Sequence, residues 1–288
     1  MTEAALDTLS RHRTFGGWTG YYGFASAATG TPMRFGLFEP PQAAERKVPV
    51  LIYLAGLTCD ETTFLIKAGA QRLAARLGLM LVAPDTSPRG LDLPGIRDSW
   101  DFGEAAGFYL DAVMDPWAAN FRMESFVTRD LPAVLGAHFP AADLGRVGIM
   151  GHSMGGHGAL TLSLRHPDLF RSVSALAPIG APSQVPWGKK AFTHYLGNDR
   201  SAWDAHDAVA LIRSGRRFPG PVRVDQGTAD KFLTEQLRPE LLEAACHEAG
   251  LSLELHRHDG YDHGYFFIQT VIDDHLRHHA GQLGIQGS

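Results

Sequence analysis

The sequence predicts an α/β fold in which helices cover both faces of a mostly parallel sheet. Short apolar runs alternate along the chain with segments of helical spacing, the order that a parallel sheet requires. Residues 151–155 read Gly-His-Ser-Met-Gly, a G-x-S-x-G pattern that places a serine in a sharp strand-to-helix turn. An aspartate and a histidine follow in loops after the late strands, at residues 230 and 263.

The predicted strands are apolar runs bounded by turn residues. They cover residues 18–24, 33–38, 48–54, 79–83, 147–150, 173–177, 222–225 and 251–256. Helical spacing predicts helices over residues 64–77, 125–139, 234–249 and 264–279, and one that opens at Gly155. We expect Gly78 to cap the first helix, Ser125 to be the N-cap of the second, and Pro132 to kink or break it.

The chain is expected to form one domain over residues 1–288, because no repeat, low-complexity segment or linker divides it. Two excursions, residues 85–122 and 178–215, are aromatic and rich in Gly and Pro. We expect them to be functional loops above the sheet.

Composition narrows the functional classes. A net charge of −5 argues against a nucleic-acid groove, which would need a basic stripe. The 2 cysteines make no disulfide framework, so a reducing compartment is expected. Residues 1–13 lack the apolar region of a signal peptide, and no apolar run is long enough to predict a membrane span.

The G-x-S-x-G pattern predicts a nucleophile elbow with Ser153 as the nucleophile. Its flanks fit, because an apolar run precedes it and small residues follow it. Gly151 and Gly155 would leave room for the strained turn and for close packing of helix on strand. The pattern alone also arises by chance, so this context carries the prediction of an α/β-hydrolase fold.

A serine nucleophile needs a base and the base needs an orienting acid, which follow in the order Ser, Asp/Glu, His in this fold. Asp230 lies in the loop after the strand at 222–225 and is the preferred acid, with Asp225 at the strand tip as the alternative. His263 is the preferred base, because among 14 histidines it alone lies where the last loop meets the last helix. His275 and His279 are spaced to share a metal ion, but no third ligand is evident, so no metal site is predicted.

An oxyanion hole needs two backbone N–H groups. We expect Met154, directly after the nucleophile, to provide one and Leu57, in the loop after the strand at 48–54, to provide the other. From the residues alone, that loop could equally be an ordinary strand-to-helix turn.

The sequence resembles the S-formylglutathione hydrolases of the esterase D family from about Phe15 to the terminal helix. The segments that carry the resemblance are residues 54–59, 67–72, 83–90, 99–103, 107–109, 151–160, 182–188, 225–233 and 260–263. The chain departs from the family pattern at Gly264, where serine is common, and at Gly180 and Ala181, where Cys-Asn is common.

The resemblance implies hydrolysis of S-formylglutathione to formate and glutathione, a step of formaldehyde detoxification. It also implies a cytoplasmic enzyme without cofactor, often a homodimer, with side activity on small esters. The family's triad falls on Ser153, Asp230 and His263, and its oxyanion donors on Leu57 and Met154.

Two further residues are candidates for substrate contact. Cys59 lies two residues past Leu57 and could line the acyl pocket, or it could be a small buried cysteine. Trp187, in the second excursion, could form a wall of the substrate cleft or be a core tryptophan.

Other functions remain open at this stage. A general short-chain carboxylesterase would share the whole triad, and the ratio of kcat/KM for thioester and simple ester distinguishes it. An acyltransferase would need a hydrophobic acceptor channel, which the sequence does not reveal. A non-enzymatic binding protein on this fold would be expected to lose a triad member, and the chain keeps all three.

Overall fold

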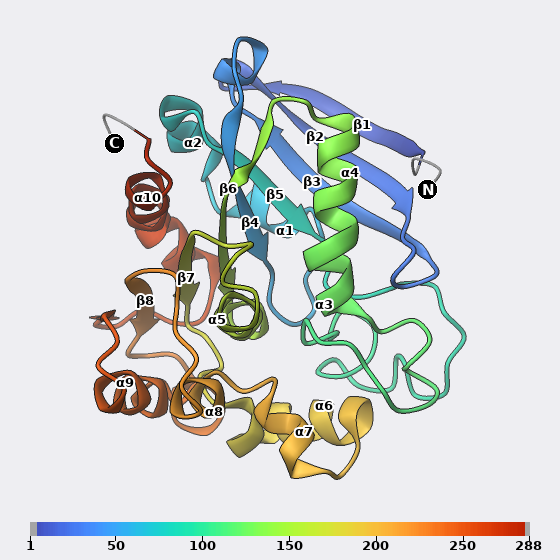
Figure 1. The fold of residues 1–288 in the computed structure, drawn as a ribbon, viewed down its shortest axis with the longest axis vertical. Helices are drawn as coiled ribbons and strands as arrows, with labels where there is room; N and C mark the ends of the chain where they lie inside the picture. Colours follow the sequence, from blue (N-terminus) through green and yellow to red (C-terminus); the bar gives the residue numbers. More distant parts are fainter. Residues whose placement is uncertain (1–4, 286–288) are drawn as a thin grey trace.

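The computed structural model describes residues 5–285, and its centre is one nine-stranded sheet in the order β1-β2-β3-β5-β4-β6-β7-β8-β9 (Figure 1). The strands from β5 onward in this order are parallel, and β1, β2 and β3 form an antiparallel extension. The strands are β1 Leu6–Thr14, β2 Gly17–Ala25, β3 Pro32–Glu39, β4 Val48–Leu54, β5 Met80–Pro84, β6 Ala142–His152, β7 Ser172–Leu176, β8 Val222–Gly227 and β9 Leu253–His258.

Helices lie on both faces of the sheet, with α2 and α10 on one side and α4 and α5 on the other (Figure 1). The α-helices are α1 Thr63–Lys67, α2 Gln71–Leu77, α3 Met123–Ser125, α4 Leu131–His138, α5 Met154–Arg165, α6 Pro186–Leu196, α7 Arg200–Asp204, α8 Ala208–Arg213, α9 Pro239–Glu248 and α10 Tyr265–Gln282. Two 3₁₀ turns, η1 Pro41–Ala44 and η3 Pro182–Gln184, and two π-helical turns, η2 Phe126–Asp130 and η4 Leu233–Leu237, complete the elements. This arrangement confirms the predicted fold class.

The central strands are buried on both faces, which explains why they read as continuous apolar runs. Every residue of β4, β5 and β7 is buried. Because β4, β6, β7 and β8 run parallel, their carboxyl ends meet at one edge of the sheet, where this class of fold binds its ligands. The loops after β4, β6 and β8 are therefore brought together.

The N-terminal strand β1 was not among the predicted strands. It pairs only with β2, at the edge of the sheet, and all of its residues are exposed or half-buried. An edge strand of this kind needs no apolar run, so the pattern that reveals the central strands is missing here.

The helix predicted over 64–77 is two helices, because Gly69 adopts a left-handed backbone (φ 71°) between α1 and α2. Gly78 is the predicted cap: it has φ 70° and ψ 40°, and its N–H donates to Ala74 O. The predicted helix over 234–249 is also interrupted, since Arg238 has φ 48° and Pro239 starts α9 afresh.

The helix predicted over 125–139 begins two residues earlier, at Met123, so the prediction of Ser125 as its N-cap is wrong. Ser125 lies inside the first turn, and its hydroxyl and N–H both donate to Asp111. The π-helical turn η2 ends just before Pro132, which stands in the first turn of α4. Proline cannot donate a backbone hydrogen bond, so a wider turn at this point replaces a regular ladder.

The two excursions differ from each other. Residues 85–122 carry only isolated β-bridges, whereas 178–215 contains α6, α7 and α8 in place of the expected loop. The excursions are joined to one another: Tyr195 OH donates to Ala106 O over 2.9 Å, and Lys190 Nζ lies 2.5 Å from Asp101 Oδ1. They pack together at one end of the molecule (Figure 1).

Candidate active site

The turn predicted at residues 151–155 is present between β6 and α5. Ser153 has φ 57° and ψ −116°, a backbone conformation that a residue with a side chain rarely adopts. Two glycines make the turn possible, because a Cβ on Gly151 would lie 2.1 Å from Gly155 O and one on Gly155 would lie 1.9 Å from Leu54 O. Glycine thus stands at the two positions where another backbone segment approaches too closely for a side chain. Ser153 lies in the turn between them, directly before the first residue of α5.

Asp230 and His263 meet as the loop prediction requires. His263 Nδ1 lies 2.5 Å from Asp230 Oδ2, and the aspartate side chain is fully buried. Asp230 is oriented by its own turn, since Phe232 N–H donates to Oδ1 over 2.8 Å, and by Gln226, whose amide nitrogen donates to Oδ2 over 3.3 Å. A buried carboxylate fixed in this way holds the imidazole in one tautomer and stabilises its protonated form.

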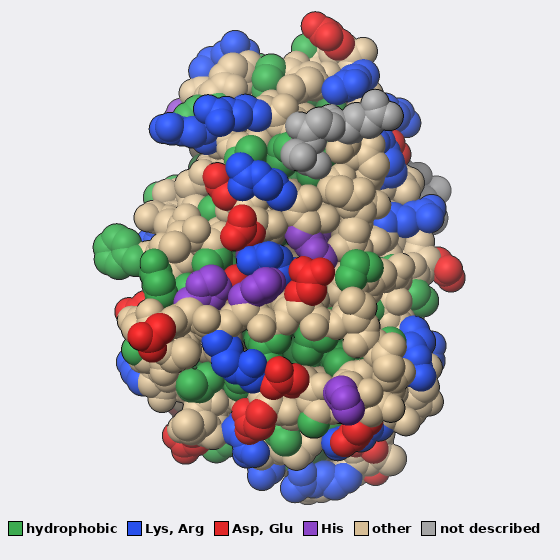
Figure 2. All heavy atoms as spheres, turned by 90° about the vertical axis from the view of Figure 1, so that its left-hand side faces the viewer, with side chains coloured by type: hydrophobic (Ala, Val, Ile, Leu, Met, Phe, Trp, Pro, Cys, Tyr) green, Lys and Arg blue, Asp and Glu red, His purple; other side chains and the backbone are tan. Residues whose placement is uncertain are grey.

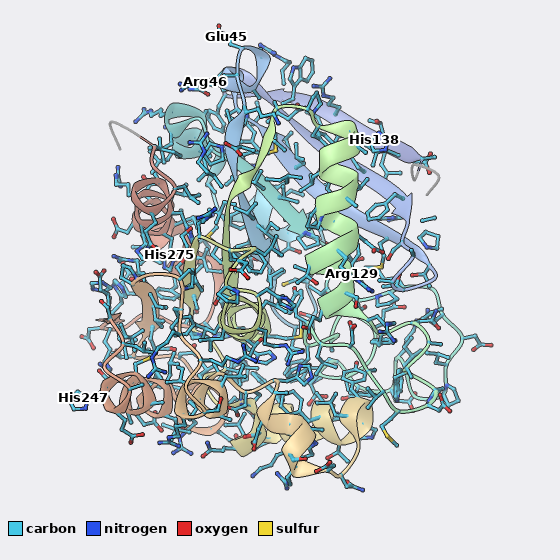
Figure 3. The ribbon with its side chains drawn as sticks, in the orientation of Figure 1. Glu45, Arg46, Arg129, His138, His247 and His275 are labelled. Carbon is cyan, nitrogen blue, oxygen red and sulfur yellow. The ribbon has the colours of Figure 1, made fainter. Side chains whose placement is uncertain are left out.

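The alternative acid, Asp225, is engaged elsewhere. Its fully buried carboxylate lies 2.7 Å from Arg223 Nε, 2.7 Å from His258 Nε2 and 3.0 Å from His275 Nε2. Burial alone would raise the pKa of Asp225, but its histidine and arginine partners hold that pKa well below its ordinary value. Asp225 thus belongs to a buried cluster between the sheet and α10, where Figure 3 labels His275.

The loop after β4 stands against the candidate nucleophile. A Cβ built on Gly56 would lie 3.2 Å from Ser153 Cβ, so the backbone around Leu57 passes close to the serine. Met154 is the first residue of α5, and its N–H therefore has no acceptor within the helix. Leu57 and Met154 stay our candidates for the oxyanion donors.

Two rings that sequence reasoning did not select flank His263. The His152 ring centroid lies 4.4 Å from that of His263, and the Phe232 ring makes an edge contact at 5.1 Å. Both ring nitrogens of His152 are buried and have no hydrogen-bond partner within residues 5–285. Burial, followed by the proximity of His263, lowers the pKa of His152 well below its ordinary value, so the ring is neutral beside the candidate base. His152 directly precedes Ser153 and Phe232 follows Asp230 by two residues, so their sequence positions place them near the triad but do not predict the ring contacts.

Cys59 is half-buried beside Tyr265, on the α10 side of the site. Burial raises the pKa of its thiol, which makes the thiolate scarce at neutral pH. Its carbonyl is fixed by two donors, Thr86 Oγ1 at 2.7 Å and Arg89 at 2.9 Å, so the loop that contains Leu57 is tied to the first excursion.

Trp187 is only 6% exposed, and its ring lies 4.7 Å from Phe232 and 5.5 Å from the exposed Trp100. It is therefore joined to the triad loop through Phe232. Cys59 and Trp187 stay our candidates for substrate contact.

The two histidines considered for a metal ion are hydrogen-bonded inside the protein. His279 bonds to Ser172 Oγ at 2.6 Å and Ser174 Oγ at 2.8 Å, and His275 Nδ1 also bonds to Ser174 Oγ at 2.8 Å. Within residues 5–285, no group of three or more His, Cys, Asp or Glu side chains is arranged to hold a metal ion.

A nucleophile elbow at the end of a central strand, with an aspartate–histidine pair from the loops after two later strands, is the arrangement of α/β hydrolases. The "Putative esterase" family model matches residues 26–278. The chain belongs to the esterase family of S-formylglutathione hydrolases.

Relatives of that name support this placement over nearly the whole chain. The S-formylglutathione hydrolase of Rattus norvegicus is 48% identical over 282 residues, covering 96% of this chain and 99% of the relative. That of Paracoccus denitrificans is 48% identical over 280 residues, covering 97% and 99%. The solved structure of an S-formylglutathione hydrolase from Agrobacterium tumefaciens superimposes with a TM-score of 0.94 at 47% identity, covering 96% of this chain and 100% of that one.

Proposed function

We propose that this chain hydrolyses the thioester S-formylglutathione to formate and glutathione, with Ser153 as nucleophile, His263 as general base and Asp230 as its orienting acid. The observation that carries the proposal is the buried Asp230–His263 pair, with Nδ1 and Oδ2 2.5 Å apart. The imidazole of His263 packs against His152, the residue directly before the serine of the strained elbow. Sequence identity of 47–48% with S-formylglutathione hydrolases over nearly the full length supports the choice of substrate.

In the acylation step, Ser153 Oγ attacks the formyl carbon while His263 Nε2 takes the hydroxyl proton. The carbonyl electron pair moves to oxygen, where the N–H groups of Leu57 and Met154 stabilise it. The C–S bond then breaks, leaving a formyl ester on Ser153, and the departing thiolate of glutathione takes the proton from His263 Nε2, so that the imidazole is neutral again. Because a thiol has a pKa of about 8.5, the thiolate leaves readily, and proton donation by His263 matters less than for an amine.

In the deacylation step, a water molecule attacks the formyl ester and gives its proton to His263. The second tetrahedral intermediate collapses by breaking the bond to Ser153 Oγ, which recovers the proton from His263, and formate is released. Asp230 stays ionised and stabilises the imidazolium in both steps. All atoms are accounted for by thioester and water, so the cycle needs no cofactor.

The test is a comparison of kcat/KM for S-formylglutathione and p-nitrophenyl acetate. Contacts to the remote glutathione moiety that persist in the transition state raise kcat/KM for the thioester. We expect a preference of at least ~10-fold, equivalent to about 1.4 kcal/mol. A thioester with a longer acyl group should react more slowly if the acyl pocket is built for one carbon. Equal kcat/KM values for thioester and simple ester would instead indicate a general carboxylesterase.

We also place this activity in the cytoplasm, in formaldehyde detoxification. Two free cysteines, one buried and one half-buried, suit a reducing compartment. None of the helices within residues 5–285 combines the length and the apolar content that a membrane crossing requires. Acidic, basic and histidine side chains are interspersed on the face that Figure 2 shows.

A homodimer is proposed from the resemblance, and sedimentation velocity of the purified protein tests it.

A further inference from the structure

An aromatic row leads from the candidate base toward solvent. Phe232 makes an edge contact with His263 at 5.1 Å between ring centroids, Trp187 lies 4.7 Å from Phe232, and Trp100 lies 5.5 Å from Trp187. Phe232 is half-buried, Trp187 is 6% exposed, and Trp100, at the far end of the row, is 55% exposed. The exposed Trp100 ring ends the row and offers an apolar surface against which a ligand could pack.

The dimensions of the row suit a peptide-sized ligand. The three centroid separations from His263 to Trp100 add up to at most about 15 Å. An extended tripeptide is about 10 Å long and therefore fits along the row. The row draws on both excursions and on the loop of the triad acid, so its rings come from three separate segments of the chain.

A lysine stands beside the start of this row. Lys231 is exposed, and its Nζ lies over the Phe232 ring, 4.9 Å from the centroid. It follows Asp230 directly, in the turn where Phe232 N–H donates to Asp230 Oδ1 over 2.8 Å. The turn that orients Asp230 therefore also fixes the backbone position from which the Lys231 side chain extends.

Lys231 has no carboxylate partner among residues 5–285. Lys190, which also borders the row, is already occupied, because its Nζ lies 2.5 Å from Asp101 Oδ1 and 2.7 Å from Ser99 Oγ. Only the Phe232 ring separates this ammonium from the His263 imidazole, and an ammonium without a carboxylate partner is available to an anionic group on the substrate.

We propose that Lys231 binds a carboxylate of the glutathione moiety, which lies along the row formed by Phe232, Trp187 and Trp100. This inference rests on the proposed function, since glutathione carries two carboxylates and one ammonium group and is therefore anionic at neutral pH. With the thioester carbon at Ser153, the peptide extends past His263 and brings a carboxylate to the lysine. Lys231 is thus a specificity-determining residue, and it takes no part in the chemical steps.

A second lysine provides the competing assignment. Lys67 Nζ lies 5.7 Å from the centroid of the Tyr265 ring, on the side of the site where Cys59 lies. Within residues 5–285, the Tyr265 ring makes a ring contact only with His152, so no aromatic row continues from it to solvent. That side also adjoins the loop of Leu57, where the small formyl group would sit. We therefore assign the glutathione carboxylate to Lys231, and the experiment includes Lys67 to decide between the two.

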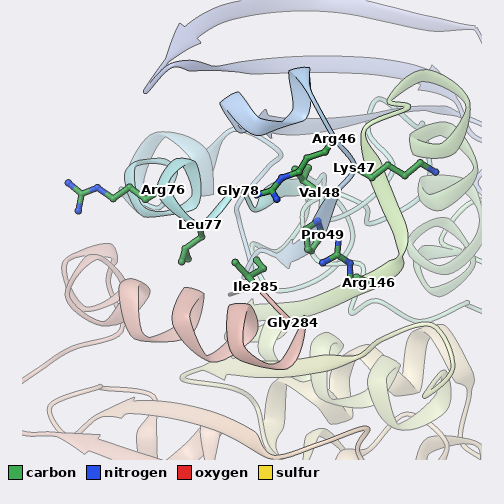
Figure 4. A pocket seen from close by; sticks show the side chains of 10 residues that line it. All are labelled: Arg46, Lys47, Val48, Pro49, Arg76, Leu77, Gly78, Arg146, Gly284 and Ile285. Atoms are coloured by element: carbon green, nitrogen blue, oxygen red, sulfur yellow. The ribbon is translucent and has the colours of Figure 1, made fainter. Parts of the chain in front are cut away.

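The experiment measures formate release from S-formylglutathione and from its dimethyl ester, which carries the same thioester without the carboxylates. The quantity compared is the ratio of kcat/KM for the two substrates in wild type, Lys231→Met, Lys231→Arg and Lys67→Met. A remote control is Lys47→Met. Lys47 lines a cavity of about 330 Å³ at the opposite edge of the sheet, just before β4 begins (Figure 4).

We expect Lys231→Met to lower this ratio about three- to tenfold, as the loss of a partly solvated charge pair does, mainly through a higher KM for S-formylglutathione. Lys231→Arg should keep most of the preference, and Lys47→Met should match wild type. Raising the ionic strength should weaken the preference of wild type and change that of Lys231→Met little.

An unchanged ratio in Lys231→Met, with the unfolding midpoint of wild type, would overturn the assignment. A lowered ratio in Lys67→Met alone would overturn it as well and move the carboxylate to the Cys59 side. Failure of the proposed function looks different: wild type would then release formate from neither thioester, whatever residue stands at position 231.

Discussion

Substituting each buried aspartate by asparagine should separate a structural role from a catalytic one. In Asp225→Asn the buried carboxylate is replaced by a neutral amide, while Arg223, with a side chain only 13% exposed, keeps its charge. The amide nitrogen would also face at least one donor, because the three partners of Asp225 all approach with nitrogen atoms. Breaking a buried ion pair by removing one partner costs about 3–5 kcal/mol.

Chemical unfolding measures this loss. With a urea m-value of about 3 kcal/mol/M, a loss of about 3 kcal/mol lowers the unfolding midpoint by about 1 M. Tryptophan fluorescence is a suitable probe, since the chain has 5 tryptophans. The folded variant should keep kcat within about a factor of three of wild type, because Asp225 contacts no member of the proposed triad.

Asp230→Asn should behave in the opposite way. Asparagine can present its NH₂ group to His263 Nδ1 and so favour the wrong imidazole tautomer, which lowers kcat by about 10³–10⁴-fold in serine hydrolases. Its effect on the unfolding free energy should be about 1 kcal/mol, the value of one hydrogen bond. If Asp225→Asn abolished turnover at unchanged stability, or if Asp230→Asn kept wild-type kcat, the assignment of the triad acid would be refuted.

Three further substitutions test other parts of the account. Gly155→Ala should destabilise the protein by about 3 kcal/mol or prevent folding, because the new Cβ would lie 1.9 Å from Leu54 O. The control is Gly281→Ala, which has open space around the site and should be neutral or stabilising by up to about 1 kcal/mol. Equal urea unfolding midpoints for the two variants would contradict this account of the packing. Burial lowers the pKa of His157 from 6.5 to about 3, so the unfolded chain takes up the proton first and stability falls as the pH drops from 6.5 toward 3. Replacing His157 with glutamine should therefore reduce the slope of unfolding free energy against pH by up to about 1.4 kcal/mol per pH unit between pH 5.5 and 4.5. An identical slope in the variant and wild type would show that the pKa of His157 is not lowered by folding. Cys59→Ser should stay active and become resistant to N-ethylmaleimide, whereas complete loss of activity in a folded variant would indicate a direct catalytic role, and unchanged sensitivity would place the reagent elsewhere.

The sheet could be predicted as far as burial on both faces makes strands read as apolar runs. β4 and β5 fall within two residues of their predicted bounds for this reason. β1 has no such run, since the antiparallel pairing that defines it depends on β2 and leaves most of its residues exposed. β1 forms because it pairs with β2, and the hydrophobic pattern within residues 6–14 alone does not predict such a pairing.

Helix existence was easier to predict than helix continuity. Helical spacing persists across Gly69 and Arg238, but both residues adopt left-handed backbone and divide the predicted helices. The glycines and prolines of residues 178–215 predict loops, yet Pro182 and Pro186 stand in the first turns of η3 and α6, where proline is tolerated.

The site could be predicted where chain order and loop position determine it, as for the Asp230–His263 contact. The ring contacts of His263 with His152 and Phe232 could not, because they depend on how α5, β6 and the triad loop pack in three dimensions. Lys231 likewise reads as an ordinary surface lysine until its position over Phe232 is known.

The central claim is that Ser153 carries the formyl group, and the most direct measurement is formate release from S-formylglutathione by Ser153→Ala. The variant keeps the elbow glycines and should fold with the unfolding midpoint of wild type. We predict that kcat falls by at least about 10³-fold, as it does when a triad serine is removed in other hydrolases. Turnover at the wild-type rate by the folded variant would contradict the account.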